Sequence, residues 1–409
     1  MGDGVGFGVG FGVGFGVGEG GYSAVRPGTD LSRYARDLLR VHDAVLAGDR
    51  PPHRPRALVE RSWTRVLGLG LDPSRANARD PVPPGELERR RRASGLAPVA
   101  ADLLRIAQDA AFLLVVTDAD GRILWRAGPT SLRHRADALG FGEGALWTEA
   151  AVGTNAIGTA LVEAAPVQLF SAEHFEQAQH AWYCSAHPVH DPRTGDLLGI
   201  VDVSGPALTL HPAIGALVET GVRLAEAQLW RHHADRLDRL RRSAAHVTGT
   251  ARGPLLIVDD HGWVAHASGV SARDRIGAPR EGVPLGVPGL GLCRAERLPE
   301  GWLVRPAGPH TAITATLDLT ADPILEVRGE GDPWRTPLTR RHADILALLH
   351  SCGPGGLTAG QISHFLYGDA AHVVTVRAEI SRLRRTVGAL VATNPYRLAA
   401  GVTLSVVRV

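Results

Sequence analysis

Residues 113–128 read LLVVTDADGRILWRAG, an apolar run, an acidic turn that contains a glycine, and a second run of strand-forming side chains. This pattern predicts a β-hairpin with strands at 112–117 and 123–126. It recurs at residues 255–269, LLIVDDHGWVAHASG. We therefore expect the same hairpin to open two sheets. They belong either to two related sensor-type domains in series or to one sensor and a second domain that only packs.

Around the first hairpin, short apolar runs and helical periodicity mix, which is typical of an α+β fold. Further strands are expected at 167–170, 183–189 and 197–203, and helices at 98–111, 154–163 and 172–181. These elements predict a domain at 96–210 with an antiparallel sheet and flanking helices. A helical segment at 31–95 precedes it. Before that segment lies a Gly-rich tail at 1–30, which we expect to be disordered because its glycines oppose ordering.

The composition excludes several function classes. All 44 basic residues are arginine, so the chain lacks the lysine that a P-loop, a protein kinase or a pyridoxal enzyme needs in its usual form. Its three cysteines are far apart in sequence, which argues against a disulfide framework or a CxxC metal site. Because no apolar run approaches the roughly 20 residues of a membrane span and no signal peptide is evident, we expect a cytoplasmic protein.

Residues 211–250 are helical by pattern, with an apolar stripe that includes Leu217, Val222 and Leu229. A helix of this length exceeds most packed helices. It is either a connector with a solvated face or, as we favour, a helix that pairs with its copy in a homodimer. Beyond it we expect a PAS-like small α+β domain at 251–331, to which the predicted strands at 302–305, 311–317 and 324–328 are assigned.

Several motifs occur in a fixed order between Leu58 and Ala227. They are ERSWTR (60–65), GLDP (70–73), the stretch 104–123, WTE (147–149), GTNAIGTAL (153–161), EHF (173–175), CSAHP (184–188), DP (191–192) and GIVDVSG (199–205). This region resembles the sensor half of acetoin-catabolism-type transcriptional activators, which implies a GAF domain that binds a small effector. Those activators continue into an ATPase module. Nothing similar follows Val247, so activation by ATP-driven remodelling is not implied.

The same region contains large apolar side chains, including Trp182, and a few polar groups. Together these are the usual lining of a ligand site. The candidate effector-binding residues are Trp147, Glu149, Asn155, His174, Phe175, Tyr183 and Cys184. Two alternatives stay open. Asn155 could cap a helix while the neighbouring glycines permit a tight turn. Cys184, Glu149 and the histidines 174, 187 and 190 are suitable metal ligands by type, but their spacing leads us to expect no metal, no other cofactor and no enzyme.

The segment 334–409 carries nine arginines against Asp344, Asp369 and Glu379, a local charge of +6 in a chain of +2. Such asymmetry is typical of a protein that binds a polyanion. Three helices are expected, beginning near 339, 358 and 373, with Thr339 and Thr358 as N-caps. Strands at 396–398 and 402–407 should form a terminal hairpin. The order resembles the winged helix-turn-helix effector domain of winged-helix response regulators, which binds double-stranded DNA.

In the third helix, residues 373, 376, 380, 383 and 387 recur at helical spacing and should face the core. Thr375, Arg377 and Arg382 are the candidates for base or groove contacts, and Arg384, Arg385 and Arg397 for phosphate contacts. The alternative is a basic helical domain that binds protein or RNA.

The sequence thus predicts a one-component transcription regulator: a GAF sensor, a dimer helix, a PAS-like domain and a winged helix-turn-helix, with RNA polymerase as a further partner. The alternative is a sensor-scaffold whose basic domain docks a protein. An enzyme built on the GAF pocket is the third reading.

Overall fold

The computed structural model describes residues 22–74, 77, 79–251, 253–271, 273–287, 290–307, 313–328, 333–393, 395–399 and 401–408. The chain forms two compact units, Met1–His232 and His233–Val409. Their boundary lies within α8 (Ile214–Ser243), so this one helix belongs to both. None of the helices described has the length and apolar character required to cross a membrane.

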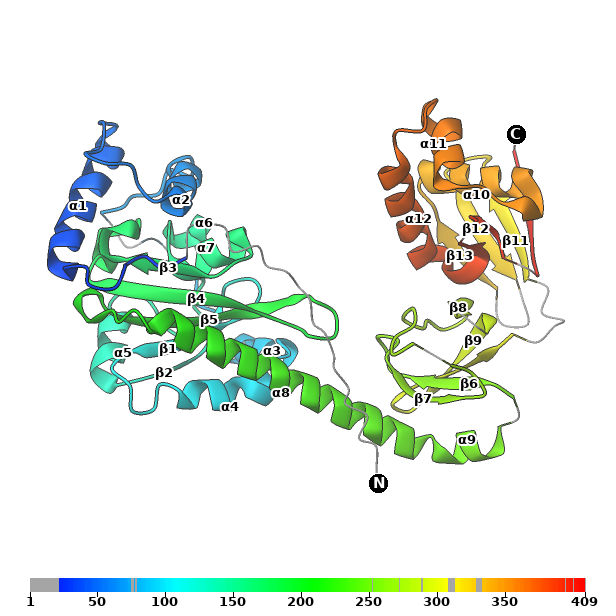
Figure 1. Ribbon diagram of the computed structural model, residues 1–409, viewed down its shortest axis with the longest axis horizontal. Helices are drawn as coiled ribbons and strands as arrows, with labels where there is room; N and C mark the ends of the chain where they lie inside the picture. Colours follow the sequence, from blue (N-terminus) through cyan, green and yellow to red (C-terminus); the bar gives the residue numbers. More distant parts are fainter. Residues whose placement is uncertain are drawn as a thin grey trace, which may run out of the picture. The chain divides into compact units, whose positions relative to one another are not determined.

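The N-terminal unit is built on a five-stranded sheet. Its strands are β1 (Leu113–Thr117), β2 (Ile123–Ala127), β3 (Val167–Phe170), β4 (Trp182–His190) and β5 (Leu197–Pro206). The order is β2-β1-β5-β4-β3, and every neighbouring pair is antiparallel (Figure 1). Position 199 on β5 requires glycine, because a Cβ there would collide with the carbonyl oxygen of Thr117 on β1. The antiparallel α+β character expected of this region is confirmed.

Helices cover both faces of this sheet, which gives two hydrophobic cores. The first core lies under α2 (Ala57–Leu67), α5 (Thr130–Asp137), α6 (Glu149–Val152) and α7 (Ala156–Glu163). The second lies under α4 (Ala97–Arg105) and the first half of α8, and α1 (Leu31–Ala47) contributes to both. The remaining helix, α3 (Pro84–Ala93), contacts β2. Alternation along β4 sends Trp182 and Cys184 to the first core and Tyr183 to the second.

Two expectations for the N-terminal unit are wrong. Residues 22–25, assigned to a disordered tail, are ordered: Ala24 and Val25 are buried, and the Ala24 amide donates to Gln168 Oε1 at 2.9 Å. The rest of the tail up to residue 21 lies outside the described residues.

The helix expected at 172–181 is replaced, in a stretch described throughout, by two short 3-10 turns, η1 (Ser171–Glu173) and η2 (Gln177–Gln179). The Glu173 carboxylate accepts from the Phe170 amide at 2.9 Å and pairs with Arg56 at 2.6 Å. The turn ends at His174, whose backbone is extended (φ −67°, ψ 145°), so no continuous helix forms.

The second unit begins with another five-stranded antiparallel sheet. Its strands are β6 (Leu255–Val258), β7 (Val264–Ser268), β8 (Leu285–Val287), β9 (Gly291–Leu298) and β10 (Gly301–Pro306). They are ordered β7-β6-β10-β9-β8. Leu240 near the end of α8 and Ala244, just before α9 (Ala245–Thr250), pack with Leu255, Ile257 and Leu303 on one face.

The internal repeat seen in the sequence is confirmed in detail. In both hairpins the register shifts at the last pair of the first strand. In both, an aspartate closes the turn with Oδ1: Asp118 accepts from the amides of Asp120 and Arg122, and Asp259 from those of His261 and Trp263. The two hairpins therefore share their turn chemistry as well as their strand pattern.

A third sheet contains β11 (Ile313–Asp318), β12 (Ile324–Arg328), β13 (Trp334–Pro337) and β16 (Val402–Val407), in the order β13-β12-β11-β16. Our assignment of 311–317 and 324–328 to the middle sheet was wrong. Their inward side chains, such as Leu317 and Leu325, instead pack with the C-terminal helices. The expected boundary between 331 and 334 would separate the hydrogen-bonded strands β12 and β13. Residues 311 and 312 lie outside the described part.

Three helices pack on this sheet: α10 (Arg340–Cys352), α11 (Ala359–Tyr367) and α12 (Val373–Val387). The expected caps are confirmed, since Thr339 accepts from the His342 amide and Thr358 from the Gln361 amide, each at 3.2 Å. The expected terminal hairpin is wrong. Strand β15 (Arg397–Leu398) pairs with β14 (Val391–Ala392), whereas β16 runs parallel to β11. Burial of Leu404 in the helical core accounts for that placement of β16.

Candidate functional site

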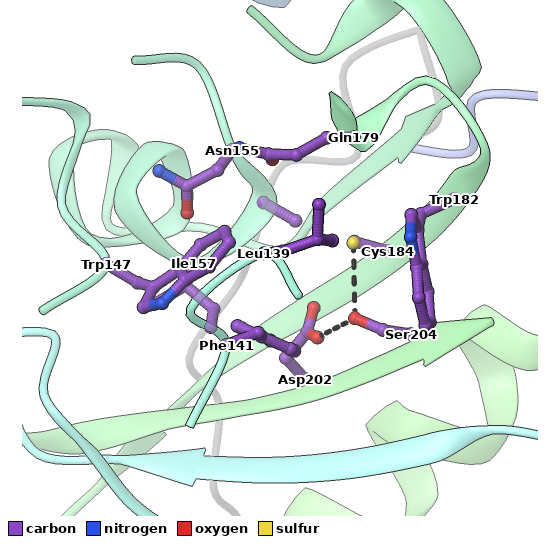
Figure 2. A pocket seen from close by; sticks show the side chains of 11 residues that line it. Leu139, Phe141, Trp147, Asn155, Ile157, Gln179, Trp182, Cys184, Asp202 and Ser204 are labelled. Atoms are coloured by element: carbon purple, nitrogen blue, oxygen red, sulfur yellow. Dashed lines mark hydrogen bonds between the residues drawn. The ribbon is translucent and has the colours of Figure 1, made fainter. Parts of the chain in front are cut away.

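A small cavity lies on the first-core side of the N-terminal sheet, against β4, β5 and the start of α7 (Figure 2). It is lined by Leu139, Phe141, Trp147, Asn155, Ala156, Ile157, Gln179, Trp182, Cys184, Asp202 and Ser204. The volume open to the centre of a water molecule is about 20 Å³, which is room for about one or two waters. In this form the cavity suits a compact molecule of a few non-hydrogen atoms rather than a nucleotide.

Aromatic side chains form rigid walls. The rings of Phe141 and Trp147 meet edge to face with centroids 4.4 Å apart, and Trp147 Nε1 donates to the Gly140 carbonyl at 3.4 Å. The guanidinium of Arg79 lies 4.6 Å from the centre of the Trp147 ring, and that of Arg135 lies 5.2 Å from the centre of the Trp182 ring. These contacts fix the walls before any ligand enters.

The polar part of the cavity consists of three side chains on β4 and β5. Ser204 Oγ donates to Asp202 Oδ2 at 2.5 Å and lies 3.2 Å from Cys184 Sγ. Asp202 is fully buried, and its Oδ1 has no hydrogen-bond partner among the described residues. Burial raises the pKa of Asp202 to about 7 and the pKa of the Cys184 thiol well above its usual value. Cys184 is therefore a neutral thiol, not a nucleophile.

The structure separates the seven predicted effector residues. Trp147, Asn155 and Cys184 line the cavity. Tyr183 faces the opposite core, and Phe175 packs against Gly153, where a Cβ would collide with its ring. The role of these residues as effector contacts stays a prediction.

Glu149 lies at the start of α6 and organises a buried polar network instead of lining the cavity. Its carboxylate accepts from Ser62 Oγ at 2.6 Å and Thr159 Oγ1 at 2.8 Å, and it pairs with Arg65 at 2.8 Å. Three motifs of the sequence, at 60–65, 147–149 and 153–161, therefore meet at one carboxylate. This gives the motifs a structural reason to occur together.

His174 is fully buried, and its Nδ1 lies 2.9 Å from the Ser171 carbonyl oxygen. Burial lowers the pKa of His174 to about 4 and that of the nearby His180 to about 3, so both are neutral near pH 7. Within the described part of the chain, no group of three or more His, Cys, Asp or Glu side chains could hold a metal ion.

Asn155 is the helix cap that the sequence allowed, and its role as an effector contact stays a prediction. It lines the cavity, and it caps α7: Oδ1 accepts from the Gly158 amide and Nδ2 donates to the Gly153 carbonyl, each at 2.9 Å.

The cap gives Asn155 a measurable effect on stability. Asn155→Ala should cost about 1 kcal/mol, a fall in Tm of about 2–4 °C for a domain of this size. Asn155→Ser, whose hydroxyl can still accept from the Gly158 amide, should lose much less. Thermal unfolding of the full chain tests this, and equal losses in the two variants would contradict a capping role.

Sequence reasoning missed Asp202 and Ser204 as cavity residues, together with Leu139, Phe141, Ile157 and Gln179. Asp202 carried a readable signal, because it interrupts an apolar strand, GIVDVSG, whose neighbours are buried. An acidic residue at such a position needs a partner or a function.

In the C-terminal part, α12 presents a basic face. Val376, Ile380, Leu383 and Val387 are buried, while Thr375, Arg377, Arg382 and Arg385 are exposed. Arg382 pairs with Glu379 at 2.5 Å. Arg384 is half-buried, and its Nε donates to the Val391 carbonyl at 3.1 Å, while exposed Arg397 donates to the Pro354 carbonyl at 3.4 Å. Thus the predicted residues lie on α12 and on β15, the second strand after it.

Residues 37–224 match the family model described as the MimR N-terminal domain. A 47.3 kDa protein of the thcA 5′ region in Rhodococcus erythropolis is 33% identical over 395 residues, which cover 94% of this chain and 74% of that protein. The acetoin dehydrogenase operon transcriptional activator AcoR of Bacillus subtilis is 33% identical, over 43% of this chain and 30% of its own length. The propane 2-monooxygenase operon transcriptional activator MimR of Mycolicibacterium goodii is 29% identical, over 47% and 33% respectively. The match with each of these two activators thus covers about a third of the activator's length.

Proposed function

This chain belongs to the family of the 47.3 kDa protein of the Rhodococcus erythropolis thcA 5′ region, and on that premise we propose that it is a transcription regulator that senses a small molecule and binds double-stranded DNA. In this proposal residues 96–210 are a GAF sensor and the C-terminal domain is a winged helix-turn-helix. The N-terminal region shares its family with regulators named as operon activators, and that kinship favours a regulator over an enzyme.

The observation that carries the DNA-binding part is the exposed face of α12. A recognition helix needs a buried apolar stripe that holds it on the domain and an opposite face of donors for bases and phosphates. Helix α12 has both, and it also exposes Val374 by 79%, an apolar side chain suited to a thymine methyl group. The short β14–β15 hairpin supplies the wing of the proposed domain.

We assign Thr375, Arg377 and Arg382 to base or groove contacts and Arg384, Arg385 and Arg397 to phosphates. Arg377 and Arg385 form no ion pair with a described residue, so both guanidinium groups are available to DNA. Arg382 would have to exchange its bond to Glu379 for a bond to DNA. Its contribution to DNA affinity therefore also depends on the Glu379 carboxylate.

Binding to genomic DNA fragments at physiological salt, with non-specific competitor present, tests the proposal. Enrichment of a repeated or palindromic site is expected of a regulator. Binding that falls with salt and prefers no fragment would favour the sensor-scaffold, whose basic domain docks another protein.

Arg385→Ala should weaken binding to every DNA sequence alike and lower the slope of log K against log[salt] by about 0.9, since one phosphate contact is lost. The matched control is Arg328→Ala, which removes an exposed arginine from β12 instead of α12. Fluorescence anisotropy across a salt series measures both. An unchanged slope for Arg385→Ala would contradict the phosphate contact.

We further propose a homodimer that pairs through α8. Val218, Val222 and Ala225 are buried against the sheet, while Leu217 and Leu224, seven residues apart, are 39% and 54% exposed. A seven-residue apolar spacing suits helix pairing. Effector binding would then favour one arrangement of the paired helices and change how two DNA-binding domains fit their half-sites. A monomer at micromolar concentration, both with and without DNA, would contradict this mechanism.

A further inference from the structure

Asp202 Oδ1 is an unused acceptor at the cavity. Buried polar atoms almost always have a partner, because leaving one without a hydrogen bond is costly. Asp202 is fully buried on β5, its Oδ2 accepts from Ser204, and its Oδ1 has no partner among the described residues. Figure 2 shows the carboxyl group between Phe141 and Ser204 at the cavity. This position suits a group that forms a hydrogen bond to a ligand.

The other polar side chains at the cavity are largely engaged. Asn155 is bonded to the Gly158 amide and the Gly153 carbonyl, and Gln179 Nε2 donates to Glu176 at 2.8 Å. The Ser204 hydroxyl donates to Asp202. A ligand would therefore meet apolar walls and one strong hydrogen-bonding atom.

Resting on the proposed sensor function, we propose that the effector is a small neutral alcohol whose hydroxyl bonds to Asp202 Oδ1 and whose hydrocarbon part lies against Phe141, Trp147 and Trp182. The size of the cavity limits the ligand to a few non-hydrogen atoms. A carboxylate ligand is disfavoured beside Asp202, and an ammonium ion would bring three donors to a lining with one free strong acceptor.

A hydroxyl fits this carboxyl better than a carbonyl does. The pKa of Asp202 is raised to about 7 by burial, so the group is present in both protonation states near neutral pH. A hydroxyl both donates and accepts, and can therefore bond to Oδ1 in either state. A ketone accepts only, so it can bond only to the protonated carboxyl.

The test measures binding of ethanol, acetone and ethylamine to the full chain at pH 6 and pH 8 by saturation-transfer NMR. We expect ethanol to bind at both values, acetone to weaken about tenfold at pH 8, and ethylamine to bind weakest. Asp202→Val should weaken ethanol about tenfold, the loss of about one buried hydrogen bond. Asp202→Asn should bind acetone equally at both pH values. Val162→Ala, at an exposed side chain outside the cavity lining, is the control and should keep the wild-type preferences.

Two results would overturn this proposal: Asp202→Val that binds ethanol as tightly as wild type, or a full chain that binds none of the alcohols from methanol to 2-propanol. DNA-fragment selection on the same preparation separates these results from failure of the proposed function. Selected DNA sites without alcohol binding would support the proposed regulator and contradict only the proposed ligand class. Alcohol binding without any selected DNA site would support the ligand class and contradict the proposed regulator.

Discussion

Arg79→Ala is expected to lower the free energy of unfolding of the N-terminal unit by about 3–5 kcal/mol, because it leaves a buried carboxylate without its counter-charge. Arg79 and Glu176 are 8% and 1% exposed, with Nη2 and Oε2 2.5 Å apart. Arg79 also donates to the carbonyls of Leu139 and Asn77, and its guanidinium lies over Trp147. These side-chain bonds to carbonyl groups and the contact with Trp147 would be lost together with the charge pair.

Thermal unfolding of the full chain measures this loss, which should lower the Tm of the N-terminal transition by about 6–20 °C. The double variant Arg79→Ala with Glu176→Gln should recover part of it, because the unpaired charge is gone. As a control, Arg40→Ala removes a surface pair with Asp37 and should cost under about 1 kcal/mol. If Arg79→Ala lost as little stability as Arg40→Ala, the result would show that the buried pair is not needed for the stability of the N-terminal unit.

Asp202→Asn is expected to stabilise the protein by about 2–4 kcal/mol at pH 8 and much less at pH 4.5. In the wild type, burial raises the pKa of Asp202 from its ordinary value of 3.8 to about 7. Between these values the unfolded chain has released a proton that the folded chain keeps. Stability therefore falls as pH rises through that window, by about 1.4 kcal/mol per pH unit. Asparagine does not titrate and avoids this loss.

Urea unfolding of both proteins at pH 4.5, 6 and 8 tests the effect. Burial of His174, His180 and His187 lowers their pKa values, which weakens the fold below about pH 6.5, but both proteins share these histidines. Their contribution cancels in the difference. If the difference in unfolding free energy between wild type and Asp202→Asn stayed constant across pH, it would contradict a raised pKa of Asp202.

The elements of the N-terminal sheet could be predicted because each strand alternates or is fully apolar and is bounded by turn residues. The cavity was harder to predict, because it depends on which neighbours share a face. Tyr183 and Cys184 are adjacent on β4, so alternation alone forbids both from lining one cavity. Asp202 and Ser204 join Cys184 only through the pairing of β4 with β5, which the sequence does not state.

In the C-terminal part, helices α10 to α12 and their caps follow from local patterns. The strands misled us because local pattern identifies a strand but not its partner. Residues 313–318 could have paired with the middle sheet by sequence proximity, yet their inward side chains are buried against helices that come later. The parallel pairing with 402–407 has no local signal, since parallel neighbours are distant in sequence.

That parallel pairing also sets an order of events during synthesis. Strand β11 emerges from the ribosome about ninety residues before its partner β16, which corresponds to roughly 5–20 seconds of translation. The three helices of the basic domain emerge within that interval, and at its end they exist without Leu404, a buried member of their core. The nascent chain can therefore complete the cavity of its N-terminal unit while its basic C-terminal domain is still unfinished.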